Sequence, residues 1–167
     1  MLILAICGSL QAKSGNLTLL QRAAALTPAG VTEQLYDGLR DLPHFSPDHA
    51  RGESPRSVSE LREAVSRSDA LLIASPEYGH SLPGSLKNAI DWLSGTGELE
   101  RKTVAITRAV PSTERGRLGL EALQNALAAV SAQLAFAEPI ACDPRFDERV
   151  SALLRALIAR AATPLEE

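Results

Sequence analysis

Two loops of this chain concentrate polar and turn-forming residues directly after apolar segments. The first, residues 8–16, reads Gly-Ser-Leu-Gln-Ala-Lys-Ser-Gly-Asn and follows the apolar residues 2–7. The second, residues 75–84, reads Ser-Pro-Glu-Tyr-Gly-His-Ser-Leu-Pro-Gly and follows the apolar residues 70–74. Loops of this kind, between a buried strand and a helix, are where open α/β folds hold ligands. We therefore expect both loops to contribute to one binding site.

The first loop has the chemistry of a cradle for a single phosphate group. It supplies hydroxyl and amide groups from Ser9, Ser14, Asn16 and Thr18. It also leads into a helix, whose N-terminal N–H groups favour an anion. The P-loop pattern is absent, and Leu10 stands at the second glycine of the dinucleotide pattern G-x-G-x-x-G. Taken alone, the loop also allows a second interpretation, a polar turn with Asn16 as a helix cap.

Other kinds of chemistry have little support in the sequence. His44, His49 and His80 are scattered and lack the spacing of metal ligands, so we expect no metal site. His80 lies in the second loop, where it would either touch a substrate or occupy a surface turn. Cys7 and Cys142 are far apart and close to apolar strand patterns, so we expect small buried hydrophobic side chains and no disulfide.

Composition and charge restrict the class of protein. The 167 residues, 45% hydrophobic and 22% charged, predict one globular domain spanning residues 1–167. The net charge of -3 argues against a general nucleic-acid or membrane-surface binder. No apolar run approaches the length of a membrane span, and we expect a cytoplasmic protein.

Strand and helix patterns alternate along the chain. We expect strands at residues 2–7, 31–35, 70–75, 103–108 and 133–137, the last reaching toward 140. We expect helices at residues 16–25, 57–68, 85–93 and about 116–131, and a last one carrying apolar residues from 150 to 158. Ser57 and Glu60 have the spacing of a capping box. Residues 36–56 have no regular pattern and would be either functional or a mobile surface loop.

This alternation predicts an α/β fold with a doubly wound, five-stranded parallel sheet. The common five-strand order is 2-1-3-4-5, with helices on both faces. In that order the first and third strands are neighbours, and a ligand crevice opens at their carboxyl ends. Both polar loops begin there, which is an independent reason to place the site between them.

Three segments carry a resemblance to a known family. They are Gly8-Ser-Leu with Ser14 and Asn16, residues 42–48 (Leu-Pro-His-Phe-Ser-Pro-Asp), and the third block from residue 75 to residue 92. The third block is the most specific, combining Ser-Pro-Glu-Tyr, Ser81, Pro83-Gly84 and Leu-Lys-Asn-Ala-Ile-Asp-Trp. With them, the chain resembles the NAD(P)H-dependent FMN reductases, flavodoxin-like proteins that include quinone, azo-dye and chromate reductases.

The resemblance implies noncovalent FMN, with NADPH or NADH as hydride donor and a small molecule as acceptor. Flavin would carry the chemistry, so no catalytic side chain is expected. The phosphate would lie on the first loop, the ring on the loop after the third strand, and residues 109–116 would complete the ring site. The implied cofactor-binding residues are Ser9, Gln11, Ser14, Gly15, Asn16, Thr18, Pro76, Glu77, Tyr78, Gly79 and Ser112.

The family also implies a homodimer or homotetramer. Its members often assemble through the region of Trp92, which would otherwise be a core residue. The helix starting near Gly116 could stabilise the charge of reduced flavin through its dipole, and Arg115 or Arg117 through a cation. The alternative for both arginines is a solvated surface position.

Two residues depart from the family pattern. Gln11 stands where the family usually has arginine, and Gly79 where it usually has asparagine. Both departures predict weaker or exchangeable FMN.

Two other functions stay open: a noncatalytic FMN-binding electron carrier, and a flavin-free structural homologue. The low aromatic content (4%) and modest charge favour the enzyme over the carrier.

Overall fold

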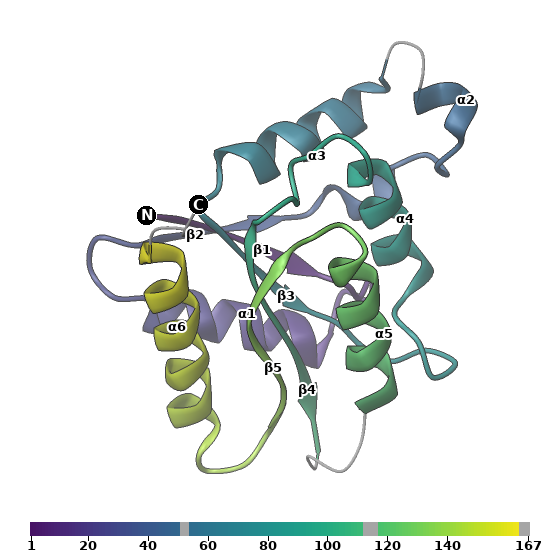
Figure 1. The fold of residues 1–167 in the computed structure, drawn as a ribbon. Helices are drawn as coiled ribbons and strands as arrows, with labels where there is room; N and C mark the ends of the chain where they lie inside the picture. Colours follow the sequence, from purple (N-terminus) through teal and green to yellow (C-terminus); the bar gives the residue numbers. More distant parts are fainter. Residues whose placement is uncertain (51–53, 112–116, 164–167) are drawn as a thin grey trace.

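The computed structural model describes residues 1–50, 54–111 and 117–163. Its strands form one parallel sheet in the order β2-β1-β3-β4-β5 (Figure 1). The strands are β1 (Leu2–Cys7), β2 (Thr32–Tyr36), β3 (Ala70–Ala74), β4 (Thr103–Val110) and β5 (Gln133–Ala141). The helices are α1 (Gly15–Leu26), α2 (Pro47–Ala50), α3 (Arg56–Arg67), α4 (Gly84–Leu93), α5 (Arg117–Ala128) and α6 (Phe146–Ala162), with a 3-10 turn η1 (Gly38–Asp41). The flavodoxin-like order expected from the sequence is confirmed.

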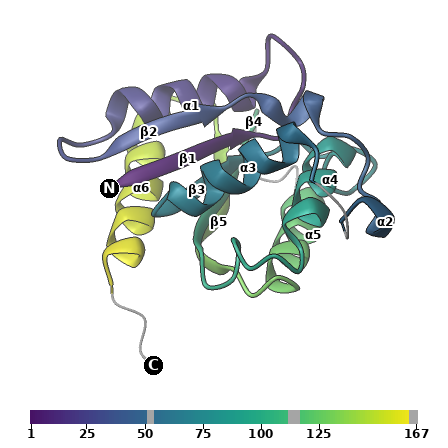
Figure 2. The ribbon, with the colours of Figure 1, turned by 90° about the horizontal axis from the view of Figure 1, so that it is seen from above.

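Helices cover both faces of the sheet (Figures 1 and 2). Because successive strand side chains point to opposite faces, β1 feeds two separate cores. Leu4 and Ile6 pack with α3, α4 and α5, whereas Ile3 and Ala5 pack with α1 and α6. β3 is buried along its whole length, whereas the edge strands β2 and β5 are partly exposed. This explains why the central strands are continuous apolar runs.

Some local predictions were wrong at helix starts. α1 begins one residue earlier than expected, and its cap is Ser14, not Asn16. α3 follows Pro55, which provides no side-chain cap, so Ser57 and Glu60 form no capping box. A proline before the first turn presets the backbone without needing an acceptor side chain. The unpatterned segment, residues 36–56, contains η1 and α2.

The structure also differs from the prediction at the end of the fourth helix and at the end of the fourth strand. α5 ends at Ala128, and Ser131 adopts a left-handed backbone conformation (φ 58°). β4 continues to Val110 because β5 pairs with it as far as Ala141. The longer β4 carries Arg108 and Ala109 beyond the end of β3, into the region where the two loops meet.

Candidate cofactor site

The exits of β1, β3 and β4 are tied together by backbone hydrogen bonds. The Gly8 N–H donates to the Ala74 carbonyl (2.9 Å), and the Ser75 N–H donates to the Thr107 carbonyl (3.0 Å). A Cβ on Gly8 would come within 2.8 Å of the Ser75 Oγ, closer than real Cβ contacts. Glycine is required here by the close approach of two strand exits. The two polar loops therefore leave the sheet side by side, as the topology predicts.

The first loop gathers two buried hydroxyls at the start of α1. Ser9 and Ser14 are each 8% exposed. The Ser9 Oγ accepts from the Gln11 N–H (3.2 Å), and the Ser14 Oγ accepts from the Asn16 N–H (3.2 Å). Each hydroxyl still has its own O–H to donate. The first turn of α1 contains no acidic residue. No carboxylate of its own therefore neutralises the partial positive charge of the helix dipole at this end.

Asn16 connects the first loop to β4. Its side chain is buried, and its Oδ1 accepts from the Ala109 N–H (2.9 Å). The neighbouring Gly15 is exposed, and a Cβ there would meet the Ala109 Cβ at an ordinary 3.5 Å. The Asn16 oxygen is therefore used to position β4, which leaves its amide N–H₂ group for a ligand.

Gln11 and Thr18 lie further out than the buried serines. Both are exposed, and the Thr18 Oγ1 donates to the Ser14 carbonyl (3.2 Å) within its own helix. Pro76, Glu77, Tyr78 and Gly79 continue directly from the exit of β3, as expected. Ser112, the remaining predicted site residue, and Arg115 lie outside the described residues.

The second loop closes in a two-residue turn. Tyr78 and Ser81 exchange backbone hydrogen bonds of 3.0 Å in both directions. Between them, Gly79 and His80 both have positive φ, at 56° and 60°. Glycine and asparagine are the residues that adopt this conformation most readily. The turn geometry therefore explains why glycine can stand at position 79.

The side chain of Glu77 connects the second loop to α5 and β4. Its Oε2 accepts from the Gly119 N–H in the first turn of α5 (2.7 Å) and lies 3.5 Å from Arg108 Nη1. A Cβ on Gly119 would come within 2.8 Å of the Glu77 Cβ. The sequence analysis missed Arg108 and Gly119. The only available signal was a glycine inside a predicted helix, which often marks close packing.

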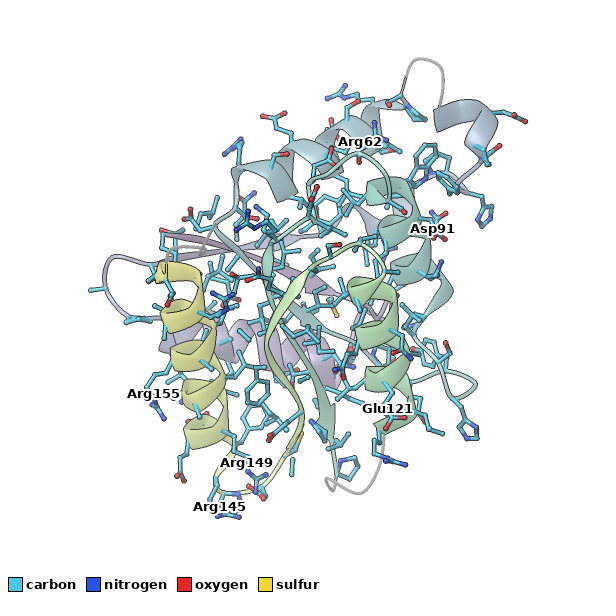
Figure 3. The ribbon with its side chains drawn as sticks, in the orientation of Figure 1. Arg62, Asp91, Glu121, Arg145, Arg149 and Arg155 are labelled. Atoms are coloured by element: carbon cyan, nitrogen blue, oxygen red, sulfur yellow. The ribbon has the colours of Figure 1, made fainter. Side chains whose placement is uncertain are left out.

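The Glu77 contact also changes the electrostatic expectation for α5. The Glu77 carboxylate already takes the Gly119 N–H in the first turn of α5, so this N–H is not available to another anion. The cation nearest to this carboxylate in the described residues is Arg108, whose Nη1 is buried without a hydrogen-bond partner. Arg117 instead pairs with Glu121 and is 80% exposed, as the solvated alternative predicted. Figure 3 labels Glu121 on α5.

Comparison with known proteins decides the family. A family model described as NADPH-dependent FMN reductase matches residues 1–141. The chain belongs to this family. An NAD(P)H-dependent FMN reductase of Pseudomonas aeruginosa is 42% identical over 92 residues, which are 55% of this chain and 49% of the relative. A quinone reductase of Escherichia coli is 34% identical over 93 residues, 55% of this chain and 50% of the relative. The chain thus matches about half the length of these relatives.

A solved structure of the same fold covers more of the chain. The flavoenzyme FerB of Paracoccus denitrificans, an NAD(P)H:(acceptor) oxidoreductase, has a TM-score of 0.82 and 26% identity. The similarity covers 96% of both chains.

The first loop of this FMN reductase family member has the types of residue that could hold the phosphate end of FMN. The buried Ser9 and Ser14 hydroxyls and the acid-free start of α1 are the groups in this loop that could hold an anion, and we call them the cradle. Gln11 lies at its edge without a charge. The thiol of Cys7 lies beneath this cradle, half-buried, and burial raises its pKa, opposed by the Ser9 backbone and the Ser14 hydroxyl. The other cysteine, Cys142, is exposed, contrary to the expectation of a buried side chain.

Trp92 is a core residue and not a surface contact. It is fully buried, and its Nε1 donates to the Pro43 carbonyl (2.8 Å). Arg62 of α3 donates to the Trp92 carbonyl (3.2 Å), which fixes α3 against α4 (Figure 3). Of the alternatives for Trp92, the interface residue is therefore excluded.

Two further observations concern the described residues as a whole. Within residues 1–50, 54–111 and 117–163, no group of three His, Cys, Asp or Glu side chains could hold a metal ion. In the same ranges, no helix combines the length and apolar character needed to cross a bilayer. A hollow of about 500 Å³ lies between residues 93–100 and 129–131, at the amino ends of β4 and β5 and away from the strand exits.

Proposed function

We propose that this protein is an NAD(P)H-dependent FMN reductase that passes hydride through FMN to flavin, quinone or a similar small acceptor. One observation carries the proposal: two buried serine hydroxyls at an acid-free helix N-terminus lie beside the exit of β3. The relatives named for FMN and quinone reduction support it. We also propose that residues 1–167 act as one domain.

The residues of the chain have binding and positioning roles in this proposal. Ser9 and Ser14 would donate to the phosphate of FMN, and the backbone of Pro76 to Gly79 would line its ring. Glu77 holds the second loop in place through its hydrogen bond with Gly119. Asn16 holds β4 in place through its hydrogen bond with Ala109. Bound FMN supplies the hydride chemistry, so the chain needs neither a nucleophile nor a general base.

We further propose that FMN is exchangeable. Gln11 has no charge to offer the phosphate, and this position is exposed. Loss of an exposed ion pair costs about 0.2–1 kcal/mol, a modest weakening. A submicromolar dissociation constant for FMN, measured by fluorescence titration, would contradict this part of the proposal.

The deciding experiment is anaerobic reduction of the protein with FMN. We expect NADPH or NADH to bleach the flavin absorbance rapidly, in a two-electron step. If FMN binds but is not bleached and a stable semiquinone accumulates on slow reduction, the protein is an electron carrier. If FMN does not bind at all, the protein is a flavin-free homologue.

Assembly and location are proposals of the same kind. We propose a homodimer or homotetramer, by resemblance to the family, and a cytoplasmic location, where both described free cysteines would stay reduced. No nucleic-acid or membrane partner is proposed.

A further inference from the structure

A second cavity lies on the other side of the first loop, between this loop and the carboxyl end of β2. Its volume is about 140 Å³. It is lined by Cys7, Ser9, Leu10, Gln11, Ala12, Leu17, Leu35, Tyr36, Asp37, Leu39 and Arg40. Sites for whole drug-sized ligands measure about 300–1,000 Å³, so this one suits a single aromatic ring system.

The walls of this cavity are apolar and accessible. Leu10 is 45% exposed and Leu35 is 43% exposed, and both line the cavity. They are two of the four large hydrophobic side chains that are exposed in the described residues. Exposed apolar side chains gathered around one hollow are a mark of a binding site.

A carboxylate, Asp37, and a guanidinium cation, Arg40, follow the end of β2 and line the cavity with these leucines. Asp37 precedes η1, yet its carboxylate makes no capping hydrogen bond to that turn. Gly38 packs so tightly on Tyr36 that a Cβ would come within 2.6 Å of the phenol oxygen, which fixes the backbone beside Asp37. Arg40 is exposed and donates only a long hydrogen bond, 3.3 Å, to the Leu10 carbonyl.

The place of the cavity in the sheet limits what its ligand can do. β2 and β3 pair with opposite edges of β1, so β1 and its loop separate the cavity from the ring loop after β3. A group bound in the cavity cannot itself exchange hydride there. A substrate that reaches this cavity can therefore place only a nonreacting part there, held for its binding energy.

We propose that this cavity binds the adenine base of the nicotinamide nucleotide, with the ribose and the 5′-phosphate of the same adenosine 5′-phosphate half at its rim. The base would lie between Leu10 and Leu35, Asp37 would accept from the ribose hydroxyls, and Arg40 would face the phosphate. An acidic residue after the second strand serves the ribose in dinucleotide-binding α/β folds. The inference rests on the proposed function, because it assigns a site to the hydride donor.

The test uses 5′-AMP and the FMN-loaded protein, so that the phosphate cradle is already filled. Isothermal calorimetry should show saturable AMP binding without release of FMN. Leu35→Glu places a charge in the apolar cavity and should raise the AMP dissociation constant about ten-fold or more. The KM for the nicotinamide nucleotide should rise to a similar extent, with kcat and the FMN dissociation constant unchanged.

Gln34→Glu is the matched control. It adds the same charge to the same strand, on the opposite face, at an exposed position. We expect AMP binding and KM to stay within about two-fold of the parent protein, as for most surface changes.

Three results would overturn the inference: no AMP binding at millimolar concentration, displacement of FMN by AMP, or equal effects of the two variants. Failure of the proposed function would look different. The nicotinamide nucleotides would then leave bound FMN unbleached, whatever AMP does.

Discussion

Glu77 shows how one carboxylate can organise a loop and a helix at once. Glu77 follows the end of β3, and its carboxylate accepts a hydrogen bond from the Gly119 N–H in the first turn of α5. That turn has no acidic residue of its own. Gly119 makes this approach possible because it has no side chain. The Glu77 carboxylate therefore acts as a cap that comes from a distant segment of the chain. This contact joins α5 to the second loop.

Gly119→Ala tests this contact. A Cβ at 2.8 Å from Glu77 must displace the loop, and we expect a loss of about 1–3 kcal/mol in the free energy of unfolding. Denaturant unfolding measures it. The matched control is Gly84→Ala, at the first residue of α4, where a Cβ meets nothing within 4 Å. That variant should be unchanged or more stable by up to about 1 kcal/mol, and equal losses in both would contradict the contact.

Ser9→Asp tests the phosphate cradle. A carboxylate at this buried position would face the phosphate of FMN, and we expect weaker binding by about 3 kcal/mol, more than 100-fold in the dissociation constant. Fluorescence titration of FMN measures the change. Ser9→Asn has a similar size without the charge and should lose much less. An unchanged FMN affinity in folded Ser9→Asp would place the phosphate elsewhere.

Among the elements, α4 anchors the segment that leads from η1 to α2. Asn88 Nδ2 and Trp92 Nε1 both donate to the Pro43 carbonyl, at 2.9 and 2.8 Å. The Asn88 Oδ1 accepts from the Phe45 N–H (2.8 Å), and the Phe45 ring meets Trp92 edge-on at 5.2 Å. Asn88 and Trp92 therefore have a structural role in this fold, which is to hold the loop at Pro43 and Phe45.

Asn88→Ala should release this segment. The Phe45 N–H loses its acceptor, which costs about 1–3 kcal/mol when the group stays buried. We expect faster amide exchange at Phe45 and a changed emission of Trp92, the single tryptophan of the chain. The neighbouring Lys87→Ala removes only a surface pair with Asp91 and should stay within about 0.5 kcal/mol. Unaltered exchange at Phe45 would show that Asn88 does not hold the loop.

β2 is an edge strand with an inward carboxyl group. Burial raises the pKa of Glu33 to about 7, and its Oε2 has no hydrogen-bond partner. Between about pH 4.5 and 7, the folded protein holds this proton while the unfolded chain releases it. The free energy of unfolding should therefore fall as the pH rises through this window and level off above it.

Glu33→Gln removes this dependence. We expect the variant to melt at a higher temperature than the parent at pH 8, with the difference disappearing near pH 4. Differential scanning calorimetry across the window measures it. Glu63→Gln, at an exposed position of α3, should show no such trend. Parallel pH profiles for the parent and Glu33→Gln would refute the assignment.

The sequence predicted the elements better than their connections. Residues 2–7 form β1 as expected, because a strand buried on both faces leaves an unmistakable apolar run. Ser14 and Pro55 were missed as helix starts, since several neighbouring residues could serve equally well. Contacts such as Asn16 to Ala109 and Glu77 to Gly119 depend on how distant loops meet in space. Local patterns carry no information on such pairs.

At the scale of the whole molecule, the proposed assembly has a direct test. We expect sedimentation to give two or four times the mass of one 167-residue chain at micromolar concentration. Since Trp92 is buried within the chain, mutation of this residue would affect folding and could not serve as an interface probe. A particle with the mass of one chain at every concentration would contradict the proposed oligomer.

The contact of Gly8 with Ser75 has a consequence for ligand choice. Because two neighbouring strand exits are in contact, the sheet sets the separation of the first and second loops where they leave it. Changes in either loop can alter what is recognised at one end, but not the distance between the ends. If the proposed site is correct, we expect the protein to select ligands by the length of the chain that joins their phosphate to their ring.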